Sequence, residues 1–110
     1  RLLAVFDAFG ELFRSDSFFG CAFIKASGEY PNLQDPVHQL AVRHKEMIQS
    51  YLRGLAAEAG AKNTDTLSKQ LVLLVDGAIA TAQVTGQAGT ADDARAAAEV
   101  LVQHAIANNA

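Results

Sequence analysis

The chain has 110 residues, half of them hydrophobic, and a formal net charge of -3. This length suits a single domain over residues 1–110, and the acidic balance leaves no basic stripe for phosphate contacts. We therefore do not expect these residues to bind nucleic acid by themselves.

One cysteine cannot form an intrachain disulfide, and no apolar run approaches the roughly 20 residues of a membrane-spanning helix. We expect a cytoplasmic protein that makes no membrane contact. Arg1 stands at the head of a helical pattern with no capping residue before it, so we also expect a further segment upstream.

Two helices are predicted in the N-terminal part of the chain. The first ends at Ser15-Asp16-Ser17, and its apolar face consists of Leu2, Val5, Phe6, Phe9, Leu12 and Phe13. The second is the stretch GCAFIKASGEYP, which Pro31 ends. Its apolar residues lie on two sides, Phe19, Phe23, Ala26 and Tyr30 on one and Cys21, Ile24 and Gly28 on the other. A short helix of this kind is expected to be buried between neighbours.

A long third helix is predicted to begin at Asp35, an N-cap residue that Pro36 follows at the first helical position, and to end at Gly60. Its apolar stripe continues for about five turns. The stripe consists of Val37, Leu40, Ala41, His44, Met47, Ile48, Tyr51, Leu52 and Leu55.

Two further helices complete the chain. Asn63 is predicted to cap the fourth, which Gly86 and Gly89 close, and Thr90 with Asp93 forms a capping-box-like start for the fifth. The core face of the fourth helix is predicted to hold Leu67, Leu71, Leu74, Val75, Ala78, Ile79 and Ala82. That of the fifth is predicted to hold Ala94, Ala97, Ala98, Leu101, Ala105 and Ile106.

Five helices without a credible strand predict an all-α domain. The fourth helix has apolar residues beyond its core stripe, and the fifth adds small residues that allow close packing. Nothing else in the chain can cover this second side, so we expect a homodimer whose last two helices form a four-helix bundle about a two-fold axis. The predicted interface residues are Val72, Val75, Asp76, Ile79, Ala82, Gln83, Ala97, Ala98, Leu101 and Ala105.

Three segments, taken together, resemble the C-terminal domain of tetracycline-repressor (TetR) family transcription regulators. They are GCAFIKASGEYP followed closely by DPV, the long helix VHQLAVRHKEMIQSYLRGLAAEAG, and LVLLVDGAIATAQVTG. The order and spacing of the segments carry the likeness, which extends over nearly the whole chain.

The resemblance implies a homodimeric regulator with an N-terminal helix-turn-helix region that binds operator DNA and a C-terminal domain that binds a small effector and dimerises. It implies that effector binding changes the spacing of the two DNA-reading heads and usually releases the operator. The helix-turn-helix is absent from this chain, so DNA binding is expected only of the parent protein.

Aromatic residues are concentrated early in the chain, which has six phenylalanines and two tyrosines. An aromatic interior with few polar groups suits a small apolar or aromatic ligand, although core packing explains any one of these residues better when it is taken alone. The predicted ligand-binding residues are Phe6, Phe9, Phe13, Phe23, His44, Met47, Tyr51 and Leu74. His44 is interpreted either as an anchor for the polar end of a ligand or as a hydrogen-bonded core histidine.

Two other residues have open interpretations. Asp76 lies among apolar neighbours and is expected to be paired, to reach solvent at the dimer seam, or to face the pocket, while Gly77 beside it suggests that another helix crosses closely. Cys21 is expected to be a buried packing residue, with a redox role as the alternative.

The sequence predicts neither catalysis nor a cofactor. His38, His44 and His104 lack partners at metal-ligand spacing, and no motif organises a nucleophile or a phosphate loop. The function predicted here is that of an effector-binding and dimerisation domain of a regulator. The alternative is a helical homodimeric interaction module that binds no ligand.

Overall fold

The computed structural model describes residues 3–14, 28–87 and 89–107, with only the helical backbone for Phe9 and residues 11–14. Four α-helices are described, namely α1 (Ala4–Arg14), α3 (Pro36–Glu58), α4 (Thr64–Thr85) and α5 (Thr90–Ala107). The predicted all-α class is confirmed, and four of the five predicted helices fall within the described residues. The predicted second helix falls mostly on residues 15–27, and so it lies outside the described residues together with Cys21 and Phe23.

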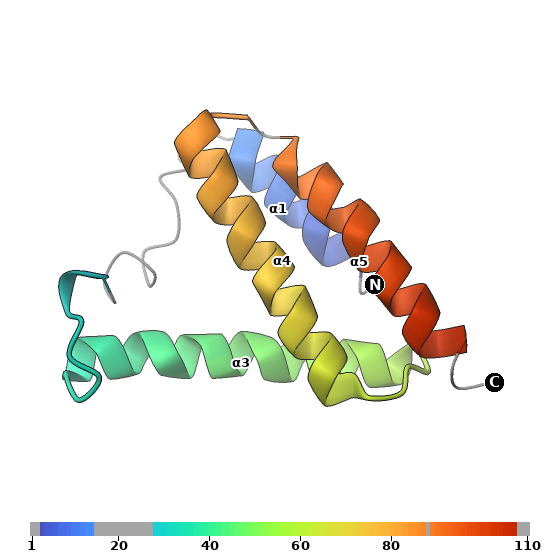
Figure 1. The fold of residues 1–110 in the computed structure, drawn as a ribbon, viewed down its shortest axis with the longest axis horizontal. Coiled ribbons are helices and arrows are strands. Elements are labelled where there is room, and N and C mark those ends of the chain that lie inside the picture. Colours follow the sequence, from blue (N-terminus) through green and yellow to red (C-terminus); the bar gives the residue numbers. More distant parts are fainter. Residues whose placement is uncertain (1–2, 15–27, 88, 108–110) are drawn as a thin grey trace.

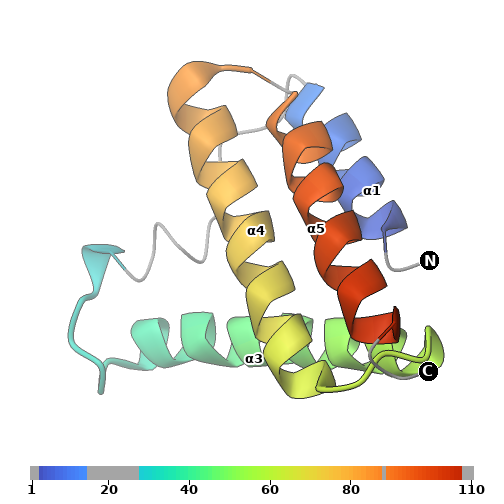
Figure 2. The same ribbon diagram turned by 45° about the vertical axis from the view of Figure 1, so that its right-hand side comes forward.

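Helices α4 and α5 lie side by side, α1 lies behind them, and α3 crosses behind α4 near the start of that helix (Figure 1). The short connection after Thr85 makes α4 and α5 an antiparallel pair, and α1 packs mainly against α5. Helix α3 packs against α4, and its N-terminal half projects beyond that helix, as the turned view also shows (Figure 2). The projecting half of α3 therefore has fewer described neighbours than its C-terminal half.

The core lies where these four helices meet. Helix α1 contributes Phe6, and α3, α4 and α5 contribute residues at three-and-four spacing, as expected for amphipathic helices with one buried face. The buried cluster consists of Phe6, Leu52, Leu55, Ala56, Leu67, Leu71, Val75, Ala78, Ile79, Ala82, Ala91, Ala94, Ala98 and Val102. Because six of these residues are alanines, the helix backbones can approach one another closely.

The ends of α3 follow the predicted signals. The Asp35 side chain accepts a hydrogen bond of 2.8 Å from the Val37 backbone N–H, and Pro36 occupies the first turn. At the other end Gly60 has φ +85°, in the left-handed region that glycine adopts without strain, and the Ala61 N–H reaches back to the Ala56 carbonyl. The long third helix and both of its end signals are therefore confirmed.

The start of α5 differs from the predicted capping box. Thr90 is itself helical, and its hydroxyl donates to the Ala78 carbonyl of α4 at 3.1 Å instead of capping its own helix. The Gly89 carbonyl accepts the backbone N–H groups of Asp92 and Asp93. The capping prediction was wrong at this point, because a carbonyl on the neighbouring helix lies within reach of the threonine side chain.

Asp35→Ala should lower the free energy of unfolding by about 1 kcal/mol, because the first turn of α3 loses its side-chain acceptor. Urea unfolding followed by circular dichroism measures the change. Glu46→Ala, at an exposed position in the same helix, is the matched control and should change stability by less than about 0.5 kcal/mol. Equal effects of the two substitutions would contradict the capping role of Asp35.

Candidate functional site

Helix α3 is apolar on two faces, not on one broad stripe. Ala41, Leu52 and Leu55 are buried against the rest of the chain. Leu40, Met47 and Tyr51 are 54%, 62% and 53% exposed, and His44 on the same side is partly buried. At 3.6 residues per turn the centre of this second face lies roughly 90° around the helix from the core face. We call Leu40, His44, Met47 and Tyr51 the α3 outer face.

The predicted ligand residues therefore separate into groups. Phe6 is only 1% exposed and belongs to the core, and Leu74 is partly buried against that core. His44, Met47 and Tyr51 lie together on the α3 outer face. The side chains of Phe9, Phe13 and Phe23 lie outside the described part of the chain.

Two hollows are open on the described surface. One of about 330 Å³ runs between α4 and α5, and one of about 190 Å³ lies between the start of α4 and the end of α5. The first is lined by Leu73, Leu74, Gly77, Ala78, Thr81, Thr90, Asp93, Ala94 and Ala97. The second is lined by Lys62, Asn63, Thr66, Leu67, Gln70, Leu101, His104 and Ala105. Neither contains a phenylalanine or tyrosine, so neither corresponds to the aromatic pocket that the sequence suggests.

The predicted interface residues also separate by burial. Those buried inside the single chain are Val75, Ile79, Ala82 and Ala98, and they have at most 7% of their surface exposed. Side chains enclosed in this way are not available to a partner. Those partly buried are Val72, Asp76, Leu101 and Ala105, whereas Gln83 and Ala97 are exposed. The surface of α4 and α5 that a partner could contact therefore lies on a different side of these helices from much of the predicted interface. The predicted set combined residues of the core stripe of each helix with residues of its outer side.

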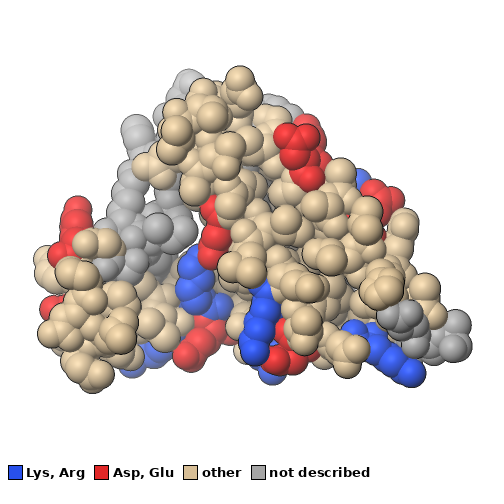
Figure 3. Space-filling model, viewed as in Figure 1, with Lys and Arg blue, Asp and Glu red and all other residues tan. Residues whose placement is uncertain are grey.

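An uncovered apolar surface does lie on the outer side of α4 and α5. Leu73, Val84 and Val100 are 70%, 86% and 67% exposed. Gly77 and Ala80 share the outer side of α4 with Leu73 and Val84, and Ala97 lies next to Val100 on α5. Few charged side chains appear over these two helices in the space-filling view (Figure 3). We call the residues Leu73, Gly77, Ala80, Val84, Ala97 and Val100 the α4–α5 outer surface.

Gly77 has open space beside it. A Cβ atom built on this glycine meets nothing within 4 Å, so none of the described helices crosses closely there. The close helix crossing that the sequence suggested at Gly77 is thus not made by the described helices α1, α3 and α5.

Asp76 forms an ion pair and hydrogen bond with Lys45, which joins α4 to α3. Both side chains are less than one-third exposed, at 31% for Lys45 and 27% for Asp76. The paired alternative for Asp76 is therefore the one observed. The sequence analysis did not single out Lys45, although its position four residues after Ala41 places it on the core side of α3.

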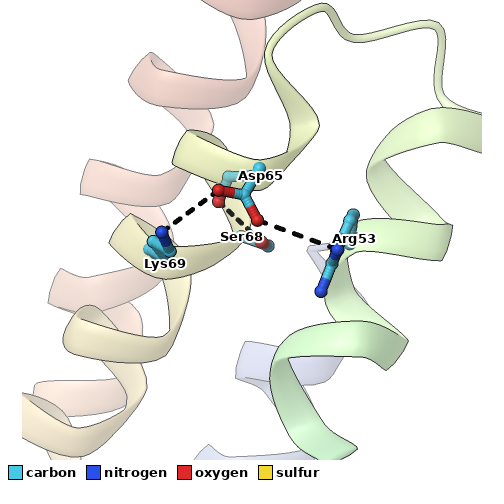
Figure 4. A network of polar contacts seen from close by, with 4 residues as sticks. All are labelled: Arg53, Asp65, Ser68 and Lys69. Carbon is cyan, nitrogen blue, oxygen red and sulfur yellow. Dashed lines mark hydrogen bonds and ion pairs between the residues drawn. The ribbon is translucent and has the colours of Figure 1, made fainter. Parts of the chain in front are cut away.

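A second polar contact joins the same two helices near the start of α4 (Figure 4). Asp65 Oδ1 lies 3.7 Å from Arg53 Nη1 of α3, and Asp65 Oδ2 lies 3.1 Å from Lys69 Nζ. The buried Ser68 hydroxyl donates to the Asp65 carbonyl at 2.8 Å. Since these ion pairs are largely exposed, each contributes at most about 1 kcal/mol to stability.

The described part of the chain shows no group of three His, Cys, Asp or Glu side chains that could hold a metal ion. Nor is any helix within it long and apolar enough to span a membrane. The features that remain are two separate apolar faces, the α3 outer face and the α4–α5 outer surface, in an all-α fold.

The described helices thus define an all-α domain, and the comparisons identify the family of such domains to which the chain belongs. The model of the family described as "Tetracyclin repressor-like, C-terminal domain" matches residues 1–98. The chain therefore belongs to this family, as the resemblance in the sequence had indicated.

Individual relatives agree with this assignment. The chain is 28% identical over 105 residues to the HTH-type transcriptional regulator YjdC of Escherichia coli (strain K12), covering 96% of this chain and 55% of YjdC, and a YjdC of Shigella flexneri matches to the same extent. The crystal structure of SCO4454, a TetR-family transcriptional regulator from Streptomyces coelicolor, superposes with a TM-score of 0.88 at 27% identity. That match covers 96% of this chain and 52% of SCO4454, so the chain spans about half the length of its relatives.

Proposed function

We propose that residues 1–110 are the effector-binding and dimerisation domain of a TetR-family transcriptional regulator. The observation that carries the proposal is the presence of two uncovered apolar faces on different helices. Large exposed apolar areas on soluble proteins are commonly binding surfaces. We assign the α3 outer face to a small apolar or aromatic effector and the α4–α5 outer surface to a second copy of the chain.

The proposed mechanism is thermodynamic linkage. An effector that binds one arrangement of the dimer better than another shifts the population by the ratio of the two affinities, and a few kcal/mol is enough to change operator occupancy. Operator DNA would be bound by a helix-turn-helix segment encoded before Arg1. That segment should contain a basic recognition helix, which sequencing of the gene upstream of Arg1 would establish.

The effector assignment is tested with the dye 1-anilinonaphthalene-8-sulfonate as an apolar aromatic probe. We expect fluorescence titration to give saturable binding at one site per chain. Met47→Ser should weaken it about tenfold, because an exposed apolar contact worth roughly 1.5 kcal/mol is removed.

Leu33→Ser is the matched control, since Leu33 is 65% exposed but lies in the loop before α3. Its effect on dye affinity should stay within about twofold. Equal losses in the two variants would show that the dye reads general surface hydrophobicity and would count against the α3 outer face. No saturable binding by the wild-type chain would favour the rival reading, an interaction module without a ligand.

A further inference from the structure

Helices α3 and α4 are joined by ion pairs at two levels. Arg53 and Asp65 meet near the start of α4, where the two helices come together (Figure 4). Lys45 and Asp76 form the second pair. Lys45 lies about two turns before Arg53 on α3, and Asp76 lies about three turns after Asp65 on α4.

These separations give the two pairs different mechanical roles. Since α3 crosses α4 instead of running beside it, the helix axes move apart with distance from the crossing (Figures 1 and 2). The Lys45–Asp76 pair lies roughly 12 Å along α3 and roughly 16 Å along α4 from the Arg53–Asp65 pair. The Lys45–Asp76 pair therefore joins the two helices at a distance from their crossing point. A contact at such a distance resists a change in the crossing angle more effectively than a contact at the crossing itself.

The two partners of this pair are placed differently with respect to the proposed functional faces. On α3, Lys45 lies on the core side of the same rigid helix whose other side forms the α3 outer face, so a displacement of that face also moves Lys45. On α4, Asp76 lies on the flank between the core residues Val75 and Ile79 and the outer residues Leu73 and Gly77. A rigid helix that rotates or tilts at Asp76 must also move Leu73 and Gly77, because all three share one helical turn.

We propose that the Lys45–Asp76 pair couples the α3 outer face to the α4–α5 outer surface. A ligand that displaces α3 strengthens or breaks the contact between Lys45 and Asp76. Helix α4 then moves, and the surface that it presents to the partner chain changes. This inference rests on the proposed function, because it needs both a ligand on α3 and a partner on α4 and α5. It adds the specific contact through which one site senses the other.

The experiment measures the dimer dissociation constant by sedimentation in the absence and presence of saturating 1-anilinonaphthalene-8-sulfonate. For the wild-type chain we expect the dye to change this constant about fivefold, at the low end of typical couplings between sites. Lys45→Gln and Asp76→Asn should each reduce the change to less than about twofold, while dye affinity and the dye-free dimer constant stay within about threefold of wild type. The exchanged pair Lys45→Asp with Asp76→Lys should restore much of the coupling.

The matched control is Asp7→Asn, which removes a different interhelical ion pair, Arg95 Nε to Asp7 Oδ1 at 3.1 Å between α5 and α1. It should leave the coupling intact. Unchanged coupling in both Lys45→Gln and Asp76→Asn would overturn the inference and leave the proposed function standing. The inference also fails if the wild-type chain binds dye and dimerises without any change in the dimer constant. A wild-type chain that neither binds dye nor dimerises would overturn the proposed function itself.

Discussion

Phe6→Ala should lower the free energy of unfolding by about 3 to 5 kcal/mol, because it leaves a cavity among side chains that cannot fully collapse. Phe6 is 1% exposed and belongs to the same buried cluster as Leu52, Leu71 and Ala98. A domain of this size is stable by only about 5 to 15 kcal/mol, so the loss is a large fraction of the total. Urea unfolding with far-ultraviolet circular dichroism measures it.

Met47→Ala is the informative comparison, because Met47 and Phe6 were both predicted to line the ligand pocket. At 62% exposure Met47 contributes little to the core, so its replacement should cost less than about 0.5 kcal/mol. If Phe6→Ala cost no more than Met47→Ala, the placement of Phe6 in the core would be contradicted. The two variants thus separate residues that support the fold from those available to a ligand.

Leu73→Glu should convert the proposed dimer into a monomer at micromolar concentration. The substitution replaces an exposed leucine on the α4–α5 outer surface by a charge that the partner chain would bury without a counter-ion. Two-fold symmetry applies the penalty twice in each dimer, so the dissociation constant should rise by about a thousandfold or more. Sedimentation velocity or native mass spectrometry reports the change directly.

Ser50→Glu is the control for Leu73→Glu, since it adds the same charge to an exposed position of α3. It should leave the association unchanged. Circular dichroism of Leu73→Glu should still show a folded helical chain, because Leu73 is 70% exposed in the single molecule. If the Leu73→Glu variant dimerised as tightly as the wild-type chain, the α4–α5 outer surface would be ruled out as the dimer interface.

Local signals in the sequence were sufficient for the helices themselves. Asp35-Pro36 marks the start of α3, and Gly60 and Gly86 adopt the left-handed conformation that ends α3 and α4. These features depend on the residue's own backbone preference or on hydrogen bonds within one turn, which explains why they can be read without knowing the neighbours. The apolar excess of α4 was also visible, and exposed Leu73 and Val84 now account for part of it.

The division of apolar residues between faces could not be predicted with the same success. The apolar periodicity of α3 placed Leu52, which is buried, in the same stripe as Met47 and Tyr51, which are exposed. In a sequence, an apolar arc that is wide enough for two faces cannot be distinguished from one broad stripe. In α4 the predicted interface included Val75 and Ile79, which the single chain buries in its own core. Which side of each helix is covered depends on the angle at which the neighbouring helix crosses.

The sequence by itself determined the all-α class, both ends of α3, the C-terminal end of α4 and the family to which the chain belongs, because these depend on local preferences and on the order of segments. Only the tertiary structure decided that Asp76 pairs with Lys45, that Thr90 donates to the Ala78 carbonyl, and that the α3 outer face is separate from the core. These contacts join residues 12 to 31 positions apart in the chain. They exist because the packing of α3, α4 and α5 brings such residues together, and periodicity within one helix contains no information about that packing.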